Sequence, residues 1–155
     1  MIEELDQNAL LRARVLTLAQ DWIDTPYQHQ ASVKHYGCDC LGFIRGLWRE
    51  LYGAEPLQTP PYSPDWSDDP KSELLLEAAE AVFLPIKNHE AQAGDVMLFR
   101  MTPQSSCKHI GLKASAITLI HAYWGQAVVE SFIVPYWQKR HAYSFAFPLQ
   151  KQRAL

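Results

Sequence analysis

The chain lacks the features that membranes, nucleic acids and repeat architectures require. Its 155 residues contain no apolar run approaching the roughly 18 residues that a membrane-spanning helix needs. The formal net charge is −3 and no Lys/Arg cluster stands out, so a nucleic-acid-binding face is not expected. No internal repeat is visible. What remains is one ordinary globular domain over residues 1–155, long enough to bury a core.

Cysteine is also scarce. Three cysteines, an odd number, do not make a disulfide framework, so free thiols in a reducing compartment are the simpler interpretation. The N-terminal stretch MIEELDQNALLRARV begins with acidic residues. It has neither the basic region nor the apolar region of a secretory signal peptide. We therefore expect synthesis in the cytoplasm without a signal peptide.

Two amphipathic helices are predicted in the first third of the chain. Residues 8–23 carry apolar side chains at helical spacing, and the following Pro26 ends that helix, because the residue before a proline avoids helical geometry. Residues 40–52 show a second apolar row. Asp39 is a good N-cap for this helix, and Gly53 is a good residue just past its end.

Two segments have no clean period and are expected to be loops. Residues 26–38 form the first, and the proline-rich residues 54–69 form the second, which we interpret as an insertion or a lid. Pro70 can open a third helix. Its expected buried face comprises Leu74, Leu75, Ala78 and Val82.

Beyond residue 83 the apolar period becomes strand-like. Short apolar runs separated by turns cover residues 96–99, 109–112, 117–123, 128–134 and 143–147. Helices first and strands later, joined by short turns, predict an α+β fold with an antiparallel sheet.

Cys40 is the first candidate for a chemical role. It directly follows the predicted cap, and a helix N-terminus lowers the pKa of a thiol because the helix dipole favours negative charge there. Backbone N–H groups in that turn could also hold an oxyanion. Gly42 and Gly46 are poor helix formers, which suggests that another backbone packs closely against this helix. Placement alone does not separate Cys40 from Cys38, and a buried structural cysteine is an equal alternative.

A thiolate nucleophile needs a base, and the base needs a group that orients it. Of the six histidines, His109 opens one strand-like run and His121 lies inside another. The other histidines lie in polar or loop-like surroundings. Two strand histidines and a helix-start cysteine suggest a catalytic triad, but spacing cannot pair them, because triads are defined by geometry.

Two other classes of function compete with a catalytic triad. Cys38-x-Cys40 and Cys107-x-His109 are short ligand pairs that could form a tetrahedral zinc site, although zinc-finger ligands usually stand further apart. A structural or binding module that has kept an enzyme fold is the other alternative.

Several motifs together resemble the NlpC-type cysteine peptidases, which cut bacterial cell-wall peptides. The similar stretches are Trp22-Ile23-Asp24-Thr25-Pro26-Tyr27, Asp39-Cys40-Leu41-Gly42-Phe43, Gly94-Asp95-Val96-Met97-Leu98-Phe99, His109-Ile110-Gly111-Leu112 and His121-Ala122. They occur in the order of the family and span roughly residues 15–135.

The resemblance implies a papain-like α+β fold and a division of roles. Cys40 would be the nucleophile, His109 the base, His121 the orienting residue and Tyr27 a polar support near the oxyanion. No metal or cofactor is implied. The implied substrate is a peptidoglycan stem peptide, cut between γ-D-glutamyl and a diamino acid.

One departure bears on where the protein acts. Leu41 stands where the family usually has a small serine, and the stretch Cys38-Asp39-Cys40-Leu41-Gly42 is similar to that of phage-associated members. A wall-cleaving enzyme without an export signal could reach the wall in a phage or phage-like tail, or by release at lysis. We therefore expect a virion or tail component, with tail proteins as partners.

Overall fold

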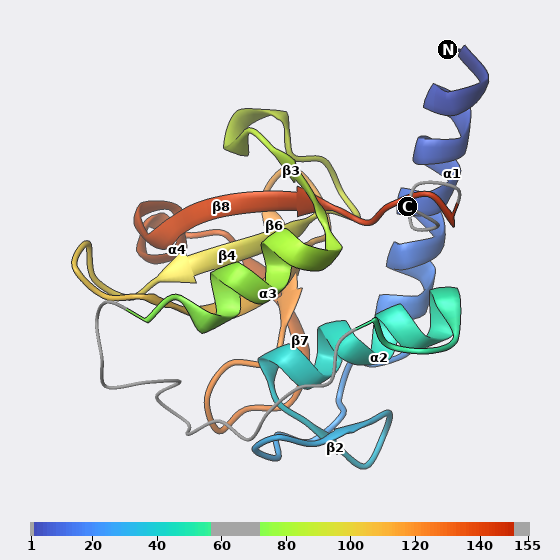
Figure 1. Ribbon diagram of the computed structural model, residues 1–155. Coiled ribbons are helices and arrows are strands. Elements are labelled where there is room, and N and C mark those ends of the chain that lie inside the picture. Colours follow the sequence, from blue (N-terminus) through green and yellow to red (C-terminus); the bar gives the residue numbers. More distant parts are fainter. Residues whose placement is uncertain (1, 57–71, 151–155) are drawn as a thin grey trace.

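The computed structural model describes residues 2–56 and 72–150 and has the predicted α+β architecture (Figure 1). Most of the proline-rich segment 54–69, and Pro70, lie outside the described residues, so the predictions for them stay predictions. No helix among the described residues is both long and apolar enough to cross a membrane.

The main sheet has six antiparallel strands in the order β3-β8-β4-β5-β6-β7. These strands are β3 (Leu84–Ile86), β4 (Val96–Arg100), β5 (Cys107–Lys113), β6 (Thr118–His121), β7 (Val129–Phe132) and β8 (His141–Ala146). A small hairpin, β1 (Ser32–Val33) with β2 (Gly37–Cys38), lies within the segment expected to be a loop. The prediction of an antiparallel sheet is confirmed, and β3 adds an edge strand that the pattern did not predict.

The helices match their local signals to different degrees. Helix α1 (Ile2–Gln20) begins and ends earlier than the predicted residues 8–23. Helix α2 (Cys40–Tyr52) begins and ends as predicted. Helix α3 (Leu74–Val82) buries Leu75 and Ala79, whereas Leu74 is exposed, so the predicted buried face is partly wrong. The short helix α4 (Pro135–Arg140) was not predicted.

Helices cover the sheet on two sides. In Figure 1, α1 (blue) lies beside one end of the main sheet, and α2 (teal) lies below the sheet. The main core joins α2 to one face of the sheet, with Phe43 packed in the same cluster as Leu98 and Ile110. A second cluster on the opposite face includes Phe99 and Trp137, the latter from α4. Because strand residues alternate between faces, Ile110 belongs to the main core while its neighbour His109 faces the second cluster.

Two glycines allow close approaches that position the first two helices. A Cβ atom at Gly42 would overlap the carbonyl oxygen of Ala31, which confirms that another backbone packs against α2. At Gly94 (φ 100°) a Cβ atom would lie 2.7 Å from the carbonyl oxygen of Arg12 in α1. At Gly46 the close neighbour is instead the ring of Trp22, a side chain.

Candidate active site

Cys40 is the first residue of α2 and lies against strand β5. Its side chain is only 8% exposed. Burial raises the pKa of the Cys40 thiol to about 12, and the charge of Asp39 adds to that shift, while hydrogen bonds from the backbone at Ile110 and Leu41 oppose it. The lowered pKa expected from the helix N-terminus is therefore wrong for the resting protein. Burial outweighs the backbone hydrogen bonds that favour the thiolate.

The start of α2 is fixed by hydrogen bonds to the preceding loop. The Asp39 carboxylate accepts the Gly42 N–H at 2.7 Å and the Gln30 N–H at 2.8 Å. The Ser32 hydroxyl donates to the Gly42 carbonyl at 2.6 Å. The Asp39 N–H donates to the Ala31 carbonyl at 3.3 Å. This set of contacts holds the helix start, and with it Cys40, at a defined position.

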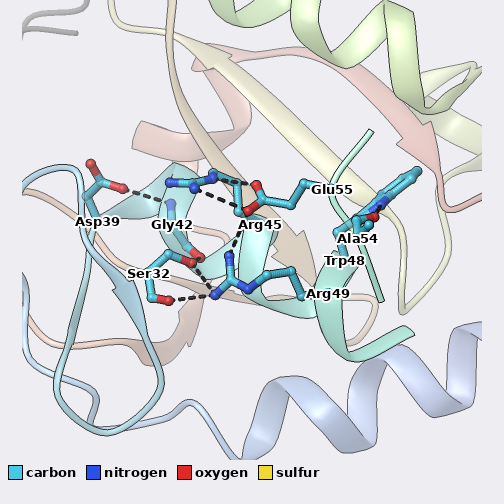
Figure 2. Close-up of polar contacts among 8 residues, drawn as sticks. All are labelled: Ser32, Asp39, Gly42, Arg45, Trp48, Arg49, Ala54 and Glu55. Carbon is cyan, nitrogen blue, oxygen red and sulfur yellow. Dashed lines mark hydrogen bonds and ion pairs between the residues drawn. The ribbon is translucent and has the colours of Figure 1, made fainter. Parts of the chain in front are cut away.

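Two arginines on α2 extend this support (Figure 2). The guanidinium of Arg49 donates to the Ser32 carbonyl at 2.6 Å and to its hydroxyl oxygen at 2.8 Å. Both Arg49 and Arg45 also bind the Glu55 carboxylate, at 3.1 Å and 2.6 Å respectively. Ser32 therefore joins the loop to two turns of the helix at once.

His109 and His121 form a buried hydrogen-bonded pair. Nε2 of His109 lies 2.8 Å from Nδ1 of His121, and the two residues are 4% and 2% exposed. The second ring nitrogen of His121, Nε2, lies 2.9 Å from the Ser131 hydroxyl oxygen. Which atom donates in each contact depends on the tautomers. The family resemblance implies that the two histidines are partners, and the structure brings them together.

An aromatic surround keeps both imidazoles out of water. The ring of His109 lies 5.6 Å from Phe99, 5.4 Å from Tyr123 and 5.1 Å from Trp137, measured between centroids. Burial lowers the pKa of His109 well below its usual value, and the neighbouring His121 lowers it further. Burial lowers the pKa of His121 to about 4. Burial therefore favours neutral imidazoles and a protonated thiol in the resting protein.

Tyr27 lies beside the segment that leads into Cys40 and α2. It forms a parallel bridge with Cys38, and its ring centroid is 5.7 Å from that of Trp124. Burial raises the pKa of the Tyr27 hydroxyl to about 12, with further contributions from Cys40 and Asp39. The phenol therefore stays protonated near neutral pH and can donate a hydrogen bond.

The four candidate residues lie on α2, β5, β6 and the loop before α2, and the structure brings His109 and His121 into direct contact. Cys40 meets β5 at Ile110, the residue after His109. Ser131 and Trp137 were not predicted. Ser131 fell within a predicted strand, but only the register between β6 and β7 shows that it reaches His121.

A zinc site does not form in the described part of the chain. Among residues 2–56 and 72–150, no three side chains of His, Cys, Asp or Glu gather as metal ligands. Cys38, Cys40, Cys107 and His109 therefore do not assemble into the four-ligand set considered from the sequence. All three thiols are free and buried.

Comparison with known proteins identifies relatives over most of the chain. The model of the NlpC/P60 family matches residues 24–144. The murein DD-endopeptidase MepS/murein LD-carboxypeptidase of Escherichia coli K12 is 27% identical over 140 residues, which cover 90% of this chain. The matched region covers 64% of that relative, so the chain spans less than two thirds of its length.

Solved structures share the fold. The NlpC/p60 domain of the peptidoglycan hydrolase SagA superposes with a TM-score of 0.64 at 19% identity, covering 88% of this chain and 98% of that domain. NlpC2 from Trichomonas vaginalis superposes with a TM-score of 0.61 at 13% identity, covering 88% of this chain and 43% of that one. At these identities the likeness is one of fold.

Proposed function

The chain belongs to the NlpC/P60 family, and from that membership we propose that it is a cysteine peptidase that hydrolyses amide bonds in peptidoglycan stem peptides. The observation that carries the proposal is the buried contact between His109 and His121, together with the hydrogen bond of Cys40 to the backbone at Ile110, the residue after His109. In this proposal His109 is the base, His121 orients it and Cys40 supplies the thiol, the three groups that covalent catalysis by cysteine requires.

In the proposed mechanism His109 removes the proton from Cys40. Nε2 of His109 pairs with His121, which leaves Nδ1 as the nitrogen that accepts this proton. Burial disfavours the charged forms of both groups, so the transfer accompanies the attack of sulfur on the substrate carbonyl instead of preceding it.

The later steps use the same residues. Backbone N–H groups at the start of α2 and the Tyr27 hydroxyl stabilise the oxyanion of the tetrahedral intermediate. The imidazolium of His109 then protonates the leaving amine, and the peptide C–N bond breaks. Water, deprotonated by His109, attacks the remaining thioester and releases the acid product and the Cys40 thiol.

The bond that is cleaved has two candidates. The motifs resemble those of enzymes that cut between γ-D-glutamyl and a diamino acid, and we propose this bond first. The E. coli relative is named for murein DD-endopeptidase and LD-carboxypeptidase activities, which makes a DD or LD bond of murein the second candidate.

The test uses purified peptidoglycan with the wild type, Cys40→Ala and the matched control Cys38→Ala. We expect wild type and Cys38→Ala to release soluble fragments and Cys40→Ala to release none, and the fragment masses identify the bond. If no variant releases fragments while an alkylating agent modifies Cys40 in the folded protein, the thiol is reactive and the substrate assignment is wrong. Loss of activity in Cys38→Ala alone would assign the nucleophile to the other thiol.

We also propose that a phage or phage-like tail carries the protein to the wall. The support is the similarity of Cys38-Asp39-Cys40-Leu41-Gly42 to phage-associated family members. Fractionation of particles from the source cells tests this directly: the protein should sediment with tails, and its absence from every particle fraction would contradict the proposal.

A further inference from the structure

We propose that Ser131 is a positioning residue that sets the tautomer of His121 and, through it, the proton of His109. The inference rests on the proposed function, in which His109 is the base. It adds a fourth member to the series of side chains that begins at Cys40.

The register of the last two strands brings Ser131 to the histidines. Leu119 of β6 pairs with Ser131 of β7, and His121 pairs with Val129. Residues two apart on a strand share a face, so Ser131 is the diagonal neighbour of His121 on the same side of the sheet. The distance of 2.9 Å between the Ser131 hydroxyl oxygen and Nε2 of His121 is a hydrogen bond.

The direction of these hydrogen bonds decides whether His109 can act as a base. A neutral His109 with Nδ1 free must carry its proton on Nε2, which then donates to Nδ1 of His121. His121 must in turn carry its own proton on Nε2, and that proton needs an acceptor. The hydroxyl oxygen of Ser131 is placed to be that acceptor.

When His109 is protonated to the imidazolium, the hydrogen bond between the two histidines must have the same direction. Protonated His109 donates from Nε2 as well, so Nδ1 of His121 must again be an acceptor. A hydroxyl accepts the His121 proton without carrying a charge, and therefore leaves His121 neutral. A carboxylate in the place of Ser131 would favour a charged His121 with protons on both nitrogens, which would oppose the Nε2 proton of His109.

The Ser131 hydroxyl makes little other contribution to the structure. Ser131 makes its one side-chain hydrogen bond within the described residues to His121. The backbone of β7 is held by its pairing with β6. Replacing the hydroxyl should therefore change the histidines more than the fold.

The test compares Ser131→Thr with Ser131→Val, which have the same shape but differ in the hydroxyl. Both are β-branched and suit a strand. We expect Ser131→Val to lower kcat on peptidoglycan by roughly three- to tenfold, the effect of one lost hydrogen bond, with KM unchanged. Ser131→Thr should retain wild-type kcat. Ser131→Asp should lower kcat further than Ser131→Val.

Two readouts do not depend on the substrate. Nitrogen NMR of the histidine rings should show His121 of the wild type and Ser131→Thr protonated on Nε2, and a mixture of tautomers in Ser131→Val. The alkylation rate of Cys40 at fixed pH should fall in Ser131→Val alone. If the wild type is inactive on peptidoglycan but these differences appear, the substrate assignment fails and the role of Ser131 stands. If Ser131→Thr and Ser131→Val share the same His121 tautomer and the same alkylation rate, the inference is wrong.

Discussion

Replacing Gly42 by alanine tests whether the close packing at the start of α2 holds the site together. In an exposed helix this substitution would stabilise the fold by about 1 kcal/mol, because glycine is a poor helix former. Here the new Cβ atom overlaps the carbonyl oxygen of Ala31, which is backbone and cannot rotate away. The loop carrying Ala31 must therefore move.

The size of the effect follows from two opposing contributions. Overpacking in a tight site costs about 1–3 kcal/mol. Displacing Ala31 also weakens the hydrogen bonds from Asp39 N–H to its carbonyl and from Ser32 to Gly42, at about 1 kcal/mol each. Setting the propensity gain of about 1 kcal/mol against these losses, we expect a net destabilisation of roughly 2–4 kcal/mol.

Gly46→Ala is the matched control, since it places the same methyl group on the same helix. Its Cβ atom would overlap the ring of Trp22. Any shift that relieves this overlap therefore occurs in the main core and not in the loop that carries Ala31. Urea unfolding measures stability, and the alkylation rate of Cys40 in the folded protein measures the position of the thiol. We expect both variants to be destabilised but only Gly42→Ala to change the alkylation rate. A Gly42→Ala protein more stable than wild type, with an unchanged thiol, would refute the reasoning.

Two further predictions follow from charge. The folded-state pKa of His121 is about 4 against an ordinary 6.5, so the unfolded chain binds more protons between these values and stability falls as the pH drops through them. Each pKa unit is worth about 1.4 kcal/mol, which predicts a loss of about 3 kcal/mol from pH 6.5 to pH 4; urea unfolding of His121→Gln over the same range should show a shallower fall. Asp39→Asn removes the charge that raises the pKa of Cys40 while keeping an oxygen for the Gly42 N–H. Alkylation of Cys40 at pH 8, followed by peptide mass mapping, should therefore be faster than in wild type, and an unchanged rate would exclude this electrostatic effect.

Local signals predicted the helix that begins at Cys40, because the residues that cap it are its sequence neighbours. Asp39 caps α2 through the Gly42 N–H, and Gly53 ends it at φ 91°. Helix α4 has six residues and no amphipathic repeat, so no periodicity could show it. The hairpin of β1 and β2 consists of two-residue strands, which are also too short for a pattern.

The electrostatics of the site depended on contacts that sequence cannot supply. The position of Cys40 at a helix start predicted a lowered pKa, but the pKa depends more on what covers the sulfur. The candidates His109 and His121 came from their strand-like surroundings and from family motifs. Their 2.8 Å contact required the pairing of β5 with β6, which fixes where two distant segments meet.

The place of Ser131 in the sheet has a consequence for how the protein responds to heat. His109 lies on β5, which is flanked by strands on both sides, whereas Ser131 lies on β7, the last strand of the sheet. Edge strands open locally at a lower free energy than the centre of a sheet. With His109 as the proposed base, its support through Ser131 lies on the strand that opens first. Catalysis would then be lost on warming before the helices and the central strands unfold.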